Sequence, residues 1–359
     1  MHLVRTLLGV LLSFFVVEVL IFHTNLYPSI VKTSSTTGYL ETFLHNERRR
    51  IVTDRNQILS IGDSRMGFLP RYVNEPNFGT GYTFATIATP GTTPRCWYYM
   101  LRDIDPTRRR YAAIVIAVDD YEDAETWENY ANRASDLHYL IARLHLSDLV
   151  EFSRSYEDPS AAMQAARGIL LKGLVYKADF QDFLRDPVAR LKEVRLSRRE
   201  SRHWFYDYVG TPNNVKNITI DWEARQVNGP PNFDPALKAE FRLRFLDPRS
   251  PEHGQHSAYL KHWFGKIYDL YRGSGTRIVF IRLPRGPFIR PDQPAQNPHS
   301  SVRELATRPD VIMSPEHFFE PLEDPQLFMD PYHMNGPGCA EFSRLLARHL
   351  RQLLGAPAG

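Results

Sequence analysis

The chain has 359 residues, 43% of them hydrophobic and 12% aromatic, and a formal net charge of +3. Such a composition excludes a largely disordered protein, and the near balance of charges gives no reason to expect a nucleic-acid partner. Two cysteines, and thirteen histidines without paired metal-ligand spacing, predict neither a disulfide framework nor a metal site, and no motif calls for an organic cofactor.

The first predicted element is the apolar segment from Leu3 to Phe22, which has close to the ~20 residues that a helix needs to cross a bilayer. Arg5 on its N-terminal flank favours that end in the cytoplasm. We therefore expect a single-pass membrane anchor over residues 1–27, with the remaining chain on the extracytoplasmic (periplasmic) side. Glu18 then has to snorkel or meet a partner helix. A cleaved secretory signal and a buried helix are the alternatives, although no Ala-x-Ala-like site follows the segment.

Residues 28–50 are predicted to form a Ser/Thr-rich tether and a leading helix, and residues 51–359 a single α/β domain. Helical patterns alternate with short apolar runs, which favours a three-layer α/β sandwich with a mainly parallel five-stranded sheet and helices on both faces. The predicted strands are Gln57–Ile61, Tyr82–Ile87, Tyr111–Val118, Arg277–Leu283 and Val311–Ser314.

Between about residues 121 and 251 the alternation of strands and helices lapses. Helical patterns occupy Tyr130–Phe152, Pro159–Phe183 and Pro187–Arg202, so we expect a largely helical insertion in the domain. Excursions of this length usually serve as lids, binding surfaces or partner contacts.

The first predicted strand stops at Gly62-Asp63-Ser64. Glycine permits a sharp exit from a strand, and a serine at the carboxyl edge of a parallel sheet lies where open α/β folds bind their ligands. Taken alone, the tripeptide also fits a strand-to-turn junction whose serine caps the next helix.

A second motif, Asp330-Pro-Tyr-His-Met-Asn335, follows the last predicted strand and precedes a final helix from Gly338 to Leu354. An aspartate three residues before a histidine can hold one ring nitrogen and leave the other facing a nucleophile. A serine hydroxyl needs such an oriented base. We therefore predict Ser64 as nucleophile, His333 as base and Asp330 as the orienting carboxylate. The alternative for the second motif is a surface turn with a helix cap.

These motifs resemble those of the SGNH (GDSL-type) serine hydrolase family. Gly62-Asp63-Ser64 matches its first block and Asp330-x-x-His333 its last, and Pro90-Gly91-Thr92 looks like the second. The resemblance implies an SGNH/flavodoxin-like fold, and an oxyanion hole formed by the backbone N–H groups of Ser64 and Gly91. It covers the sheet-forming parts of the chain and not the middle.

The third block departs from the family pattern. The family commonly has Gly-x-Asn-Asp after the third strand, with the asparagine as an oxyanion donor, whereas this chain has Ala117-Val118-Asp119-Asp120. An ionised carboxylate only accepts hydrogen bonds, so neither aspartate replaces that donor. We expect Asp119 or Asp120 to bond backbone or arginine groups near the nucleophile, with Arg65 as a candidate partner. Together with Asn335, these residues are predicted to contact substrate or support the site.

The Gly-Asp-Ser-Arg and Asp-x-x-His-Met-Asn variants look most like the membrane-anchored branch linked to acylation of cell-envelope polymers, including alginate and teichoic acid. This resemblance implies serine-dependent O-acetyl (acyl) transfer to or from an envelope polysaccharide. A membrane acyl-donor protein is a further candidate partner. An acetyl-ester hydrolase of envelope glycans, or a non-catalytic glycan-binding or scaffold protein, remain alternatives.

Cys96 and Cys339 are both placed on predicted helices that start beside the proposed site. A free cysteine usually behaves as a small buried hydrophobe. We expect two separate buried thiols, and a disulfide between them is the alternative.

Overall fold

The computed structural model describes residues 2–24, 26–50, 56–67, 69–74, 80–124, 130–200, 215–247, 253–291 and 296–356. The chain divides into two compact units. The helical unit comprises Met1–Ile51, Tyr99–Ile104 and Ala131–Trp204, and the sheet unit comprises Val52–Tyr98, Asp105–Tyr130 and Phe205–Gly359.

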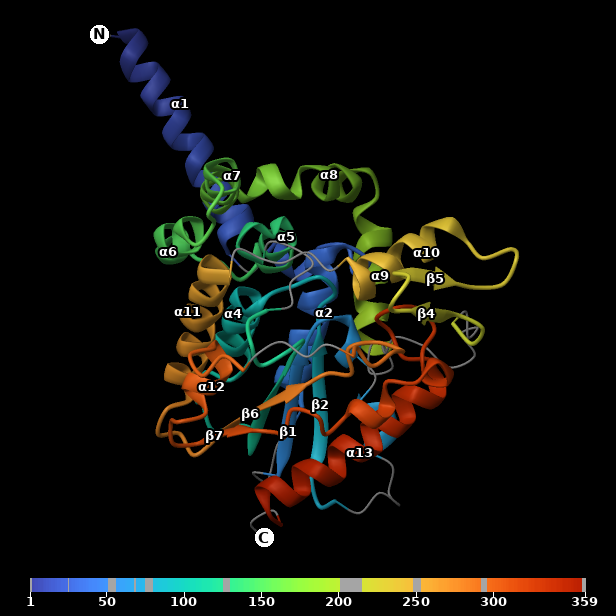
Figure 1. Ribbon diagram of the computed structural model, residues 1–359. Helices are drawn as coiled ribbons and strands as arrows, with labels where there is room; N and C mark the ends of the chain where they lie inside the picture. Colours follow the sequence, from blue (N-terminus) through green and yellow to red (C-terminus); the bar gives the residue numbers. More distant parts are fainter. Residues whose placement is uncertain are drawn as a thin grey trace. The chain divides into compact units, whose positions relative to one another are not determined.

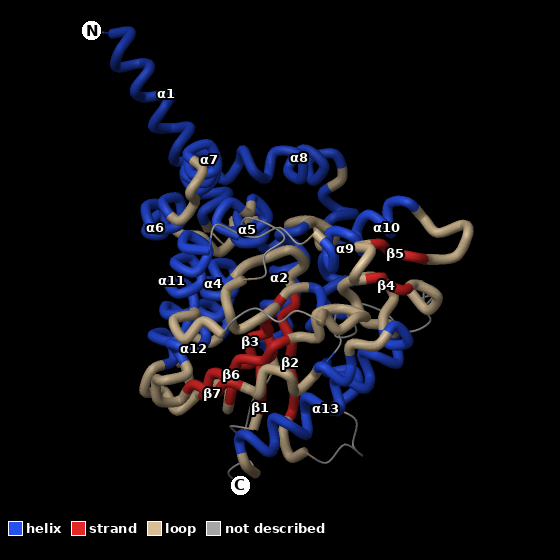
Figure 2. Tube along the Cα trace, viewed as in Figure 1, coloured by secondary structure: helices blue, strands red, loops and turns tan. Residues whose placement is uncertain are grey.

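The sheet unit is built on a five-stranded sheet in which every neighbouring pair of strands is parallel. The order across the sheet is β2-β1-β3-β6-β7 (Figures 1 and 2). Its strands are β1 (Gln57–Gly62), β2 (Thr83–Ala88), β3 (Ala113–Val118), β6 (Arg277–Arg282) and β7 (Val311–Met313). The expected α/β fold with a five-stranded parallel sheet is therefore confirmed.

Helices cover both faces of this sheet, which explains why its strands are apolar without alternation. Along β6, Val279 and Ile281 point into the core shared with α13 (Gly336–Leu354) and the short α3 (Leu69–Val73). The intervening Phe280 faces the other way and meets Phe264 of α11 (His253–Tyr271), with ring centroids 5.1 Å apart.

The remaining elements of the sheet unit lie around this framework. α4 (Pro94–Ile104) starts in the sheet unit and ends in the helical unit, and α12 (Ser301–Leu305) follows β6. Within the predicted insertion, the chain forms an antiparallel pair, β4 (Thr219–Asp221) with β5 (Gln226–Asn228), then α10 (Pro235–Phe241) and a π-helical turn (Arg242–Leu246). The β4–β5 pair lies in a part of the largely helical insertion for which no strand was predicted.

The helical unit contains α1 and most of the predicted insertion. Its helices are α1 (His2–Glu18), α2 (Thr36–Arg49), α5 (Ala134–Leu140), α6 (Leu149–Arg154), α7 (Pro159–Leu170), α8 (Lys172–Arg185) and α9 (Pro187–Glu200). α1 continues as a π-helical turn, Val19–His23. The predicted leading helix corresponds to α2, whose first turn is capped by the Ser35 side chain.

Two helices predicted as continuous are interrupted. The predicted helix Tyr130–Phe152 is divided into α5 and α6 by a turn in which His145 and Asp148 cap one another's backbone. The predicted helix Pro159–Phe183 breaks at Leu171, where the backbone is non-helical with φ −126° and ψ 74°. The break has a long-range cause, because the carboxylate of Glu18 accepts the N–H of Gly173 and so caps α8 from another part of the chain.

α1 is the one helix of the described residues that is long and apolar enough to cross a membrane, over His2–His23. Residues 2–17 are exposed without exception, so the segment is not a buried helix (Figure 1). By length and composition it fits either a single membrane anchor or a signal sequence.

Candidate active site

The turn that carries Ser64 is shaped by its two neighbours. β1 ends at Gly62, where a Cβ atom would lie 3.1 Å from the side chain of Met66, so glycine allows the chain to turn tightly. The Asp63 carboxylate accepts the N–H of Arg65 at 2.9 Å and caps a short 3₁₀ turn over Ser64–Met66. Ser64 is therefore held in the first turn after a buried strand, at the carboxyl edge of the sheet.

The loop before α13 brings His333 and Asp330 to this serine. Ser64 Oγ lies 2.9 Å from His333 Nε2, and His333 Nδ1 lies 2.8 Å from Asp330 Oδ2. The second carboxylate oxygen of Asp330 accepts the backbone N–H groups of Tyr332 and His333, each at 2.7 Å. The three residues that the motifs predicted as nucleophile, base and orienting carboxylate thus form one hydrogen-bonded chain.

The ionisation of Asp330 fixes the direction of that chain. Burial alone would raise the pKa of Asp330, but the hydrogen bond and positive charge of His333, with the two backbone N–H donors, lower the pKa below its ordinary value. An ionised carboxylate only accepts, so His333 Nδ1 carries a proton and donates it to Asp330. In the neutral ring, Nε2 is then left as the acceptor for the hydroxyl of Ser64.

Gly91 lies on the turn after β2, which is the neighbour of β1. Its φ of +63° lies in the left-handed region that glycine adopts without a steric penalty. The N–H of Thr89 donates to the carbonyl of Gly62 at 3.1 Å, so the turns after β1 and β2 are joined at the edge of the sheet. This arrangement is compatible with the predicted pairing of the Gly91 and Ser64 N–H groups.

Asp119, at the end of β3, is bound to Arg65. Arg65 Nη1 lies 2.5 Å from Asp119 Oδ1, and the same guanidinium donates three bonds of 2.7–3.1 Å to Asp63. Arg65 and Asp119 are both buried. Burial would lower the pKa of Arg65, but the two carboxylates raise it well above its ordinary value. The prediction that an aspartate of the third block pairs with Arg65 is confirmed.

Asp120 and Asn335 have backbone partners. Asp120 Oδ1 accepts the N–H groups of Glu122 and Ala124, which closes a turn after β3. Asn335 Oδ1 caps α13 by accepting the N–H of Gly338, and its amide donates to the carbonyl of Gln326 at 2.7 Å. Asn335 therefore stabilises the end of the loop that carries His333.

Arg244 is a residue of this site that motif reasoning missed. It belongs to the π-helical turn of the insertion and is buried, with two bonds of 2.7 and 2.9 Å to the carbonyl of Arg285. Its guanidinium lies 5.4 Å from the ring centroid of Tyr332 and 4.0 Å from Asp119. No spacing in the sequence connects these residues, and the abundance of arginine in the insertion was the only available signal.

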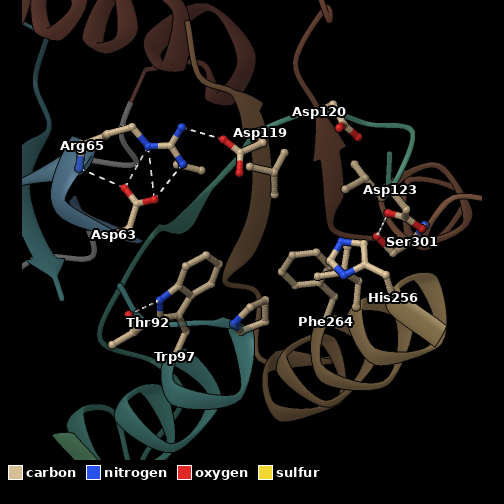
Figure 3. A pocket seen from close by; sticks show the side chains of 15 residues that line it. Asp63, Arg65, Thr92, Trp97, Asp119, Asp120, Asp123, His256, Phe264 and Ser301 are labelled. Carbon is tan, nitrogen blue, oxygen red and sulfur yellow. Dashed lines mark hydrogen bonds and ion pairs between the residues drawn. The ribbon is translucent and has the colours of Figure 1, made fainter. Parts of the chain in front are cut away.

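A pocket opens beside the turn that carries the serine (Figure 3). Its apolar side comes from α4, α11 and α12, and its polar side from the ends of β1 and β3. The apolar residues include Pro94, Trp97, Leu260, Phe264 and Val302, and the polar ones include Asp63, Arg65, Thr92, Asp119, Asp120, Asp123 and His256. Ser64 and His333 are not among its lining residues, so the pocket adjoins the hydrogen-bonded chain without containing it.

No group of three or more histidine, cysteine, aspartate or glutamate side chains is arranged to hold a metal ion among the residues that the structure describes. Cys96 and Cys339 are both buried and are not joined by a disulfide, which confirms two separate thiols. Burial raises the pKa of the Cys339 thiol, so this group is an unreactive part of the core.

Comparison of the chain with protein-family models, with curated proteins and with solved structures found no match. The resemblance to the SGNH family therefore rests on the short motifs at Ser64, Gly91 and His333.

Proposed function

We propose that this chain is a membrane-anchored serine acyltransferase that acts on an envelope polysaccharide. The observation that carries the proposal is the continuous Ser64–His333–Asp330 chain, with hydrogen bonds of 2.9 and 2.8 Å. A nucleophile, a base and an orienting carboxylate within these distances are the requirements of covalent acyl transfer. In this proposal α1 is the anchor and the rest of the chain is extracytoplasmic.

The first half-reaction makes an ester on the enzyme. Ser64 Oγ attacks the carbonyl carbon of an ester donor while His333 Nε2 takes the hydroxyl proton, and Asp330 stabilises the resulting imidazolium. The tetrahedral oxyanion is held by the N–H groups of Ser64 and Gly91. Its collapse breaks the bond to the donor alcohol, which leaves with the proton from His333, and the acyl group stays on Ser64.

The second half-reaction repeats these steps with an acceptor. A glycan hydroxyl gives its proton to His333 as its oxygen attacks the acyl carbon, and collapse of the intermediate restores the hydroxyl of Ser64. Water in place of the glycan would give hydrolysis with the same residues. Whether the acyl group is transferred or hydrolysed depends on which nucleophile is positioned at the acyl carbon and on whether water is excluded.

Transfer is favoured over hydrolysis by the context of the site. A degradative esterase gains little from an anchor, whereas a transferase benefits if its donor or acceptor is delivered at the membrane, for example by a membrane acyl-donor protein. The long helical insertion is the part of the chain with which an acceptor could be positioned. An acetyl-ester hydrolase of envelope glycans is the alternative with the same catalytic residues.

A non-catalytic glycan-binding role is favoured by one observation, the ion pair between Asp119 and Arg65 where the family has an amide donor. Loss of one oxyanion donor typically costs about 100- to 1000-fold in rate. A hole made only of backbone N–H groups therefore predicts slow hydrolysis of simple nitrophenyl esters if the site is catalytic, and none if it only binds.

Labelling with a fluorophosphonate probe tests the nucleophile. The probe should label the wild-type protein on Ser64, and Ser64→Ala should remove the label. Ser314→Ala is the matched control, because Ser314 Oγ also lies 2.8 Å from a histidine, His349 Nε2, but both residues are buried. Labelling that is absent from the wild type, or that survives Ser64→Ala, refutes the catalytic assignment.

The direction of acyl transfer needs a second assay. The protein is given an activated acetyl ester with and without an acceptor oligosaccharide, and acetylated sugar and free acetate are measured. Acetylated sugar that depends on Ser64 is the expected product. Free acetate alone across a panel of glycans, together with loss of esters from pre-acetylated glycans, would establish the esterase alternative.

A further inference from the structure

The outer end of α1 is built into the helical unit. The carboxylate of Glu18 is buried and accepts the N–H of Gly173, the second residue of α8, at 2.8 Å. A Cβ atom on Gly173 would lie 2.6 Å from Glu18 and 2.8 Å from the ring of Phe22, so only glycine permits this close contact. The charged residue within the apolar segment therefore has a fixed partner in its own chain.

Aromatic packing extends this attachment. The rings of Phe22, Tyr27, Tyr176 and Phe180 pack against one another with centroids 5.1–5.8 Å apart. The hydroxyl of Tyr27 donates to Asp179, which in turn lies 2.9 Å from Arg190 of α9. The outer end of the apolar segment is thus attached to α8 by several independent contacts.

The length of the apolar segment determines how deep α8 would lie. Leu3–Phe22 has about the number of residues that span a hydrocarbon core of ~30 Å. Residues 3–17 stand clear of the unit and rise only about 22 Å at 1.5 Å per residue. The final ~7 Å of the span is the part packed on α8, and any tilt of α1 makes the free part shorter still. A fully spanning α1 therefore brings α8 to the boundary between headgroups and acyl chains.

The surface next to this junction carries exposed large apolar side chains on three consecutive helices. They are Met163 and Leu170 of α7, Leu174 and Leu184 of α8, and Val188 at the start of α9. Met163 and Leu170 are seven residues apart and share one face of α7. Exposure ranges from 37% for Leu170 to 76% for Val188.

Basic side chains accompany these apolar residues. Lys177 and Arg185 are exposed on α8. Helices that lie in the membrane interface combine an apolar face with lysine and arginine, and they bury the apolar face about 5–10 Å below the headgroups. That depth agrees with the ~7 Å by which the α8 contact shortens the free span of α1.

We propose that α7, α8 and the first turn of α9 form a lipid-binding platform that lies in the outer interface of the membrane crossed by α1. Its apolar side chains enter the acyl-chain boundary, and its lysines and arginines contact anionic headgroups. The inference rests on the anchor role of α1 in the proposed function, but it adds a second, separate membrane contact that holds the helical unit at a fixed depth.

Site-directed spin labelling of the full chain in vesicles that contain anionic lipid tests this platform. A nitroxide is attached to a cysteine at Leu174 or Leu184, since the native Cys96 and Cys339 are buried. The readout is the accessibility of the label to oxygen, which partitions into lipid, relative to a water-soluble nickel chelate. Leu196→Cys on α9 is the matched control, because Leu196 is 50% exposed, as Leu174 is at 51%, but lies two turns beyond Val188.

Labels at 174 and 184 should be more accessible to oxygen than to the nickel chelate, as in lipid. The label at 196 should be more accessible to the nickel chelate, as in water. A label at Leu11→Cys of α1 reports the anchor independently. If position 11 is in lipid while 174 and 184 are as accessible to the chelate as 196, the platform is refuted and the anchor stands. If position 11 is itself in water, the anchor is refuted, and with it the premise of the platform.

Charge reversal on the lipid side gives a second test. Lys177→Glu combined with Arg185→Glu should reduce the oxygen accessibility of a label at 184 in anionic vesicles, while a label at position 11 is unaffected. Lys177→Arg combined with Arg185→Lys keeps the charge and should leave the oxygen accessibility of both labels as in the parent protein. Equal accessibility at 184 for both double variants would refute the headgroup contact.

Discussion

Replacing Asp119 by asparagine separates two roles for the residue that follows β3. In the structure its carboxylate lies 2.5 Å from Arg65 Nη1 inside the protein, as an ion-pair partner. In the family that the motifs resemble, an asparagine at this position donates to the oxyanion. The substitution removes the charge, keeps the shape and introduces that amide, so the two roles predict opposite changes.

The loss of stability expected in Asp119→Asn depends on the partners that Arg65 keeps. A buried charge left without any partner costs about 3–5 kcal/mol, but in Asp119→Asn the guanidinium still has Asp63 at 2.7 Å. The loss is therefore closer to that of one charge-assisted hydrogen bond, about 1.5–3 kcal/mol. For a unit of this size, about 2 kcal/mol corresponds to a fall in Tm of about 4–8 °C.

The assay combines thermal unfolding with the rate of fluorophosphonate labelling. Asp120→Asn is the control, because its retained carbonyl oxygen can still accept the N–H groups of Glu122 and Ala124, and its Tm should stay within about 1 °C of wild type. We expect Asp119→Asn to lower Tm without raising the labelling rate. An unchanged Tm together with labelling that is about 10-fold faster or more would refute the ion-pair role and restore the family's oxyanion donor.

Three further predictions concern single groups. Ser64→Ala and His333→Ala should each abolish ester turnover with little change in Tm, and Asp330→Asn should retain more activity than His333→Ala; wild-type turnover in either alanine variant would contradict the assignment. Because the pKa of Asp330 is lowered in the folded protein, ionised Asp330 stabilises the fold above the unfolded pKa of about 3.9, and this contribution is lost as the pH falls through the folded pKa. The free energy of unfolding of Asp330→Asn should therefore depend less on pH in the acid range. Burial lowers the pKa of Lys172 to about 8, so the free energy of unfolding should rise between about pH 8 and 10.5. Lys172→Met should remove this pH dependence and stabilise the protein at pH 7 by about 3 kcal/mol. If the pH dependence persists in the variant, it belongs to another group.

The fold was predictable because its strands are buried on both faces. A continuous apolar run flanked by charge, as in β3, has only one stable place in an α/β protein. The predicted and observed strands therefore agree within one or two residues, for example Arg277–Leu283 against Arg277–Arg282 in β6. Local composition was sufficient for β1 and β3, in which every residue except Val118 is buried.

The interruptions of the helical insertion were not predictable from local pattern. Leu171 sits between two segments with good helical periodicity, and the chain breaks there because Glu18 of α1 caps the next helix at Gly173. A contact between residues so far apart in the chain leaves no trace in a window of ten or twenty residues. The same limit applies to the β4–β5 pair, whose strands have only three residues each.

The candidate site likewise contains residues that the sequence predicted and one that it did not. Ser64, His333 and Asp330 were found because each lies in a motif whose spacing already encodes a hydrogen bond, such as the three residues between the carboxylate and the ring. Arg65 was found because it adjoins the nucleophile. Arg244 was missed because its partners come from separate segments, and each contact is made by geometry that no spacing encodes.

Arg244 also indicates why the insertion and the loop of His333 need one another. A Cβ atom on Gly286, which has φ +145°, would lie 2.5 Å from the carbonyl of Pro331 and 2.6 Å from the ring of Phe245. The loop after β6, the π-helical turn of the insertion and the triad loop therefore meet where only glycine fits, and Arg244 joins the same three segments through the carbonyl of Arg285 and the ring of Tyr332. Since Tyr332 immediately precedes His333, the orientation of the base depends on a part of the chain that contains none of the motifs. A sequence could thus keep all three motif residues and still lose the geometry on which acyl transfer depends.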